Sequence, residues 1–84
     1  MESLKRSSGV DTELLSEQVQ VERKCFSFNL RENPRGRFLR ITEDVGGRRD
    51  TIIVPSTGLV QVRDILNLAI AADEKAGPCN VELN

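Results

Sequence analysis

Apolar and polar residues alternate in two stretches of the segment from Glu13 to Leu30, which is typical of a half-buried strand. The apolar positions are odd-numbered at Val19 and Val21 and even-numbered from Phe26 to Leu30. A slip of one position exchanges the two faces of a strand, and a bulge or bend commonly accommodates it. We therefore expect one long strand over residues 13–30, interrupted by a kink near residues 23–24.

Two further strands follow, each bounded by turn residues. The segment 32–36, Glu-Asn-Pro-Arg-Gly, is a turn because Asn initiates turns, Pro fixes one backbone angle and Gly accepts a positive φ. Residues 37–43 form a short strand, residues 44–50 with their two glycines form a hairpin loop, and residues 51–54 form a strand that ends at a proline. The sequence does not show a fourth strand plainly, although either loop region has room for one.

A helix is predicted from about Gly58 to Ala76. Ser56 or Thr57 is placed to cap its first turn, and the Gly-Pro pair at residues 77–78 ends it. Its apolar residues form one stripe at helical spacing, which consists of Leu59, Val62, Leu66, Ala69 and Ile70, with Ile65 at the margin. Strands followed by one helix indicate an α+β fold in which the helix crosses an antiparallel sheet.

The 84 residues hold one domain, which we place at residues 12–77 between a flexible N-terminal segment (1–11) and a short C-terminal tail (78–84). A domain of this size buries only about 60% of its unfolded surface, so a partner chain would add needed stability. No apolar run approaches the roughly 20 residues that span a bilayer, and no secretory leader is evident. We therefore expect a protein that is not secreted, with Cys25 and Cys79 as free thiols.

The net charge of −1 conceals an uneven distribution of charge. Residues 1–22 and residues 50–84 each carry a net charge of −3, whereas residues 23–49 carry a net charge of +5. Seven of the eight basic residues in that central segment are arginines. A local basic surface of this kind supports contacts with phosphate groups even when the whole chain is acidic.

The predicted strand 37–43 places Leu39 and Ile41 on one face. If these two residues meet the helix, the other face of the sheet is open to solvent. That open face gathers the aromatic, amide and basic residues of two strands: Phe38, Arg40, Asn29 and Arg31, with Asn33 and Arg35 at the edge. An exposed ring stacks on a base with about 1–3 kcal/mol, and guanidinium groups hold phosphates. A strand phenylalanine is more often core, however, and the ring can equally be buried against a partner chain.

The segment 24–43, Lys-Cys-Phe-Ser-Phe-Asn-Leu-Arg-Glu-Asn-Pro-Arg-Gly-Arg-Phe-Leu-Arg-Ile-Thr-Glu, together with Thr-Ile-Ile-Val-Pro-Ser-Thr-Gly at 51–58, resembles the PUR repeat of the Pur-alpha family, and its plant-type members most. The resemblance covers about residues 14–72. It implies a four-stranded antiparallel sheet followed by one helix, related to the Whirly fold, with two repeats intertwined in one working domain. Because only one repeat is present, it also implies a homodimer, or a heterodimer with another PUR repeat.

The resemblance further implies binding of single-stranded, purine-rich DNA or RNA in transcription or RNA regulation, in the nucleus and/or the cytoplasm. The family's binding positions map onto Lys24, Arg31, Asn33, Phe38 and Arg40, and we add Arg35 and Arg37 of the Arg-Gly-Arg core. The chain departs from the family pattern at residues 22–23, where Glu-Arg replaces a common pairing of Gln with a small polar residue.

An enzyme is not expected, because the sequence has no histidine, no Gly-rich phosphate loop ahead of a helix and no spacing typical of a metal site. Accordingly, we expect no cofactor, no small-molecule substrate and no membrane partner. The alternative function is a protein-interaction module that dimerises with another PUR-repeat protein and regulates it.

Overall fold

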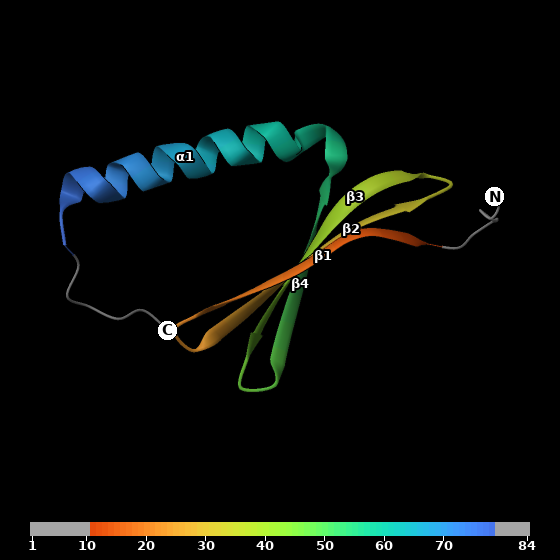
Figure 1. The fold of residues 1–84 in the computed structure, drawn as a ribbon, viewed down its shortest axis with the longest axis horizontal. Coiled ribbons are helices and arrows are strands. Elements are labelled where there is room, and N and C mark those ends of the chain that lie inside the picture. The colour runs from red at the N-terminus through yellow and green to blue at the C-terminus, as the bar shows by residue number, and fades with distance from the viewer. Residues whose placement is uncertain (1–10, 79–84) are drawn as a thin grey trace.

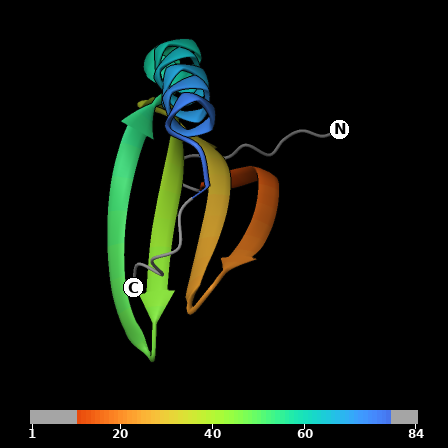
Figure 2. The same ribbon diagram turned by 90° about the vertical axis from the view of Figure 1, so that its left-hand side faces the viewer.

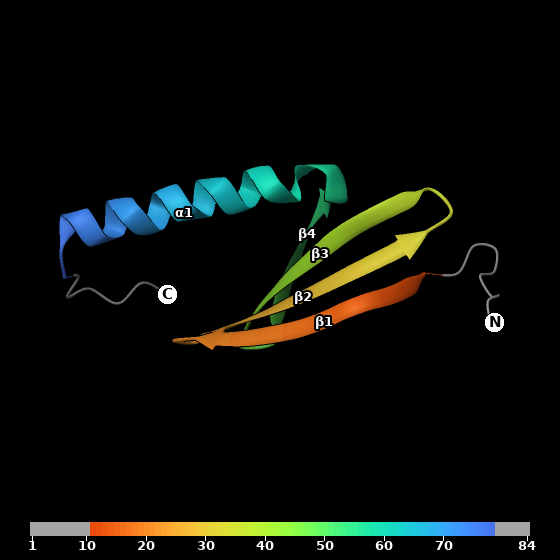
Figure 3. The ribbon, with the colours of Figure 1, turned by 45° about the horizontal axis from the view of Figure 1, so that its top comes forward.

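Four strands followed by one helix make up the fold (Figure 1), which confirms the predicted α+β class. The computed structural model describes residues 11–78. The strands are β1 (Thr12–Val21), β2 (Lys24–Asn33), β3 (Gly36–Val45) and β4 (Arg48–Pro55), and a 3-10 turn at Ser56–Gly58 leads into α1 (Leu59–Ala76). The sheet is an antiparallel meander in the order β1-β2-β3-β4 (Figure 3). Most of the predicted N-terminal segment, most of the predicted tail, and Cys79 lie outside the described residues.

Short turns join the strands, so β3 and β4 are longer than the sequence pattern predicted. Between β2 and β3, the Oδ1 atom of Asn33 accepts hydrogen bonds from the backbone N–H groups of Arg35 at 2.9 Å and Gly36 at 3.2 Å. Between β3 and β4, Gly46 and Gly47 adopt φ angles of 61° and 87°. Positive φ angles at both central residues match the twist of a hairpin, which is why this turn uses Gly-Gly.

The predicted single strand over residues 13–30 is wrong. The chain reverses at residues 22–23, where Glu22 adopts a left-handed φ of 55°, and Val21 pairs with Lys24 while Val19 pairs with Phe26. In a hairpin with a two-residue turn, an odd-numbered residue always faces an even-numbered one, and cross-strand partners lie on the same face of the sheet. The slip in the apolar pattern therefore marks a hairpin and not a kink.

A β-bulge interrupts β1 near its start. Glu13 pairs with Arg31 and Leu15 pairs with Leu30, so Leu14 is the extra residue. Arg31 and Leu30 are adjacent on β2 and point to opposite faces. The bulge consequently places the Glu13 side chain on the face opposite that of Leu15, although both positions are odd-numbered.

The register divides the side chains of the sheet into two faces. The apolar face carries most of the large aliphatic and aromatic residues of the four strands: Leu15, Val19, Val21, Phe26, Phe28, Leu30, Leu39, Ile41, Ile52 and Val54. The polar face carries Glu13, Ser16, Gln18, Cys25, Ser27, Asn29, Arg31, Phe38, Arg40, Thr42, Asp44, Arg49, Thr51 and Ile53. The alternation of apolar and polar residues thus separates a face that needs cover from a face that suits solvent.

The helix α1 does not pack on the sheet of its own chain (Figures 1 and 2), which corrects the expectation that it crosses that sheet. From Val60 to Ala76 every residue is exposed, and no residue in the range 11–78 is fully buried. The Cα radius of gyration is 16.4 Å, against about 12 Å for a compact domain of this length. The apolar face and α1 therefore both lack the cover that a globular core requires. Within the same range no helix is long and apolar enough to cross a membrane.

The helix boundaries differ from prediction at one end only. Ser56 and Thr57 lie in the 3-10 turn and do not cap α1; its N-cap is Gly58, without a side-chain hydrogen bond. At the other end, Gly77 adopts a φ of 87° and its N–H donates to the carbonyl of Glu74 at 3.2 Å, which ends the helix as predicted.

Candidate nucleic-acid interface

An open groove of about 580 Å³ crosses the polar face of the sheet. All four strands contribute to its lining, through Gln18 of β1, Cys25, Ser27 and Asn29 of β2, Arg40, Thr42 and Asp44 of β3, and Arg49 and Thr51 of β4. Hydroxyl, amide and guanidinium groups dominate this lining. The groove therefore presents hydrogen-bond donors and acceptors along a path that runs across the strands.

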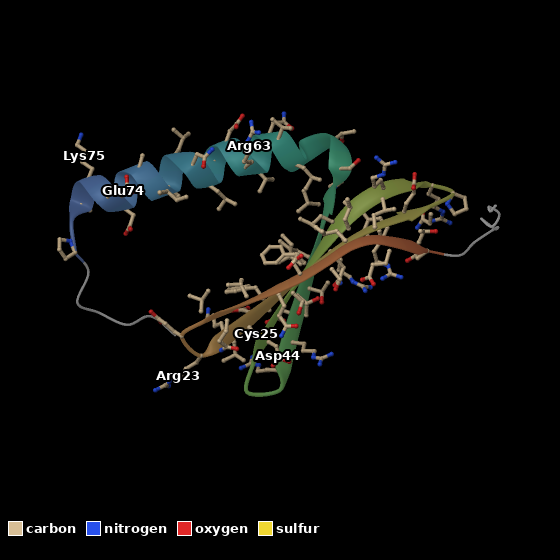
Figure 4. All side chains as sticks on the ribbon, viewed as in Figure 1. Arg23, Cys25, Asp44, Arg63, Glu74 and Lys75 are labelled. Carbon is tan, nitrogen blue, oxygen red and sulfur yellow. The ribbon has the colours of Figure 1, made fainter. Side chains whose placement is uncertain are left out.

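Contacts between neighbouring strands order the floor of the groove. The hydroxyl groups of Thr42 and Thr51 are 3.2 Å apart, and the Nε2 group of Gln18 donates to the Sγ atom of Cys25 at 3.0 Å. Near the β3–β4 turn, Arg49 Nε donates to Asp44 Oδ2 at 3.1 Å, and Cys25 and Asp44 are cross-strand partners (Figure 4). These pairs fix side chains that would otherwise be free, so the groove is partly pre-organised.

The predicted aromatic and basic residues come together at one end of this groove. Asn29 pairs with Arg40 across β2 and β3, and Arg31 pairs with Phe38 at the next position on the same face. The Phe38 side chain is half-buried on the polar face, opposite the face that carries Leu39. The sequence-based placement of Phe38, Arg40, Asn29 and Arg31 on one face is therefore confirmed.

Two carboxylates contact Arg31. Its Nε group lies 3.4 Å from Asp11 Oδ2, and its Nη1 group lies 3.5 Å from Glu13 Oε2. The same Glu13 Oε2 atom accepts a hydrogen bond from Asn29 Nδ2 at 2.9 Å, and Asn29 Nδ2 also donates to Ser16 Oγ at 3.1 Å. Arg31 is thus held in place, whereas none of the described carboxylates forms an ion pair with Arg40.

Two of the predicted binding residues lie on the other face of the sheet. Lys24 shares the apolar face with Phe26, and its Nζ group lies 2.8 Å from Glu43 Oε2. Arg37 forms an ion pair with Glu32 at 3.1 Å on that same face. The structure therefore does not bring Lys24 and Arg37 together with Phe38.

The remaining predicted residues, Asn33 and Arg35, lie at the β2–β3 turn. The Oδ1 atom of Asn33 already accepts the two hydrogen bonds that close the turn, and Arg35 lies at the exposed tip of the turn. Arg35 can therefore reach a phosphate near the Phe38 end of the polar face, and Asn33 retains its amide N–H₂ group as a donor.

The sequence analysis missed the groove residues outside this end. Gln18 was missed because the sequence analysis predicted one continuous strand where the structure has the β1–β2 hairpin. Thr42 and Thr51 were missed because a threonine on a strand does not by itself indicate a binding site. Ile53 was also missed; it is 53% exposed and pairs with Arg40 on the polar face. If the one-position slip in the apolar pattern had been interpreted as a hairpin, Gln18 would have been placed on the correct strand. Nothing in the sequence indicates that Ile53 stays exposed.

Three or more potential metal ligands do not cluster anywhere in the described residues 11–78. The polar face offers the Phe38 ring for stacking, guanidinium groups for phosphates, and amides and hydroxyls for base edges. Residues 2–77 match the family described as PurA, "PurA ssDNA and RNA-binding protein". The chain belongs to the PurA family.

Named relatives of the chain are PurA-family proteins from plants and mammals. It is 48% identical over 64 residues to "Transcription factor Pur-alpha 1" of Arabidopsis thaliana, covering 76% of this chain and 22% of that protein. It is 33% identical over 67 residues to "Transcriptional activator protein Pur-alpha" of Mus musculus, and equally to that of Homo sapiens, covering 79% of this chain and 21% of each protein. The chain therefore spans about a fifth of the length of these PurA relatives.

Proposed function

We propose that this PurA-family chain binds single-stranded, purine-rich DNA or RNA through the polar face of its sheet. The observation that carries the proposal is the register of β2 and β3, which sets Phe38 beside Arg31 and Arg40 beside Asn29 at the end of an open polar groove. Family membership supports the same assignment. The groove lies on the face that the apolar residues do not use, so binding and core formation do not compete for the same side chains.

The chemistry of the groove suits a single strand better than a duplex. Bases in a single strand are free to leave the stack, so the Phe38 ring can replace a neighbouring base, and amide groups such as that of Asn29 can reach Watson–Crick edges. Arg40 and Arg35 supply positive charge to the phosphates on either side. Lys24 and Arg37 lie on the other face and do not contact a strand bound in this groove.

We further propose that the working unit is a homodimer. No residue in the range 11–78 is fully buried, although a compact domain encloses a hydrophobic core. Twelve large apolar residues of that range are exposed, on the sheet and on α1 alike. Exposed apolar surface on this scale marks a site of protein–protein association.

The apolar face of the sheet and the apolar stripe of α1 are suited to pack against each other. The sheet has an apolar face without a helix, and α1 has an apolar stripe without a sheet, because α1 projects away from its own strands (Figure 1). A second copy supplies each with its missing counterpart if α1 of one chain lies on the apolar face of the other. The same operation applied twice gives a closed, two-fold symmetric pair.

The names of the relatives support a regulatory role. The named relatives are a transcription factor and transcriptional activators, and we propose that this chain acts in transcription or RNA regulation in the nucleus. The exposed apolar surfaces also support a second candidate, in which the chain pairs with the PUR repeat of a longer protein and regulates it.

Titration of a fluorescent purine-rich oligonucleotide tests the binding proposal. We expect binding that weakens with added salt, because phosphate contacts release counterions. Phe38→Ala should lower the affinity by about 1–3 kcal/mol per stacked base while the circular dichroism spectrum stays unchanged. Leu68→Ala, which truncates an exposed apolar side chain of α1 outside the groove, is the control. Absence of binding by the wild-type chain at low salt would contradict the proposal, and loss of folding in Phe38→Ala would place that ring in the core.

A further inference from the structure

The contact between Arg31 and two carboxylates has a consequence for the polar face, provided that this face binds nucleic acid as proposed. We propose that Glu13, assisted by Asp11, competes with nucleic-acid phosphates for Arg31 and so limits the affinity of the polar face. Phosphate and carboxylate use the same donors of a guanidinium group. A phosphate can therefore bind Arg31 fully only after these carboxylates have moved away.

The bulge in β1 is what brings Glu13 to Arg31. With regular pairing, Glu13 would share the apolar face with Leu15, because the two positions are both odd-numbered. The extra residue Leu14 rotates Glu13 onto the polar face, where it becomes the direct cross-strand partner of Arg31. Bulges commonly re-aim a side chain next to a functional site, and this one aims a negative charge at a surface proposed to bind a polyanion.

The environment of Arg31 shows that the contact is more than a passing surface pair. The Arg31 side chain is 21% exposed, whereas those of Arg37 and Arg49, each paired with a single carboxylate, are 51% and 73% exposed. Glu13 is itself anchored, since its Oε2 atom accepts the hydrogen bond from Asn29 at 2.9 Å. Asp11 reaches Arg31 from the residue that precedes β1, at 3.4 Å. The guanidinium group is thus enclosed by acceptors from two directions.

The competition singles out one of the arginines of the polar face. Arg40 has no ion-pair partner among the described residues and is available to phosphate directly. Arg31 becomes available only by exchange of its carboxylates. Because electrostatic contacts supply nearly all sequence-independent affinity, restraint of Arg31 lowers binding to any strand that offers phosphates alone.

The variant Glu13→Gln tests the proposal, because glutamine keeps the length of the side chain and an acceptor for Asn29 while removing the charge. Exposed ion pairs are individually modest, so we expect affinity to rise about two- to fivefold at about 0.1 M salt. Asp11→Asn combined with Glu13→Gln should raise it further, to about five- to tenfold. The gain should be equal for a (GGA)n oligonucleotide and for oligo-dT of the same length, and it should shrink as salt is added.

Glu22→Gln is the matched control, since it makes the same charge change in the β1–β2 turn. The stretch of β2 from Lys24 to Arg31 is about 23 Å long at 3.3 Å per residue, more than twice the Debye length at 0.1 M salt. Because salt screens the interaction over this distance, we expect Glu22→Gln to change the affinity less than about 1.5-fold.

A second background isolates the role of Arg31. In an Arg31→Gln chain, Glu13→Gln should bring no gain, because the group that the carboxylate restrains is gone. Three results would overturn the proposal: no gain in Glu13→Gln, an equal gain in Glu22→Gln, or a gain that persists in the Arg31→Gln background. A loss of binding confined to the (GGA)n strand would instead show that Glu13 contacts a base and would also overturn it. If the wild-type chain binds neither strand, the proposed function fails before this inference is reached.

Discussion

Truncation of one leucine on α1 tests whether the protein forms the proposed dimer or exists as a single chain. Leu66 lies on the apolar stripe of the helix, whereas Leu68, two residues on, points about 200° away at 100° per residue. In the single chain the two side chains are similarly exposed, at 57% and 66%. Leu66→Ala and Leu68→Ala therefore remove the same groups from the same helix and change helix propensity equally.

The two truncations should differ only if the stripe is covered by a second chain. Leu→Ala at a buried position costs at least about 2 kcal/mol, and a two-fold dimer contains the site twice. Leu66→Ala should thus weaken dimerisation by about 4 kcal/mol, which raises the dissociation constant about a thousandfold. Leu68→Ala should stay within about 0.5 kcal/mol of the wild type, as surface substitutions usually do.

Size-exclusion chromatography with light scattering, over a dilution series from high to low micromolar protein, measures this difference. We expect wild type and Leu68→Ala to elute as dimers, and Leu66→Ala to dissociate or unfold within the series. A wild-type chain that is monomeric and folded throughout would refute the reasoning. Equal behaviour of the two variants would show that the stripe is not the surface that is covered.

Three further outcomes are expected. Arg40→Gln should weaken single-strand binding about tenfold at low salt and reduce the salt slope by about 0.7, whereas Lys24→Gln, on the other face, should leave the slope unchanged; fluorescence anisotropy at several salt concentrations checks both. Asn33→Ala removes the acceptor of two turn hydrogen bonds and should lower Tm by about 4–8 °C, while Asn33→Asp, which retains an acceptor, should lower it less. Glu22→Gly relieves a left-handed φ of 55° and should raise Tm by a few degrees in a thermal melt, since an L-residue there costs about 1 kcal/mol.

The sequence predicted the structure best where a local pattern is compatible with only one backbone arrangement. Alternation in β3 correctly placed Phe38 and Arg40 on one face, because a period of two admits no other arrangement. Gly77 and the Asn-Pro-Arg-Gly turn correctly marked the end of α1 and of β2, since few residues satisfy those backbone angles. The α+β class followed from the order of these elements.

The errors arose where a local pattern had two physical explanations. The parity slip between Val21 and Phe26 fits a bulge and a tight hairpin equally well, and no Gly or Asn marks the turn, because Glu22 adopts the left-handed conformation instead. The bulge at Leu14 changes the face of Glu13 without any sequence signal. The position of α1 could not be predicted either, because an apolar stripe indicates that a helix needs cover but not whether its own chain supplies it.

The opposition of the two faces of the sheet also fixes how many binding surfaces an assembled protein presents. A dimer closed through its apolar faces carries two copies of the polar face, both turned outward. A long strand that reaches both copies binds the second in an intramolecular step, so its avidity exceeds the affinity of one face by orders of magnitude. A short oligonucleotide confined to one copy gains nothing from this. The length of the nucleic acid would then set affinity as much as its base sequence does.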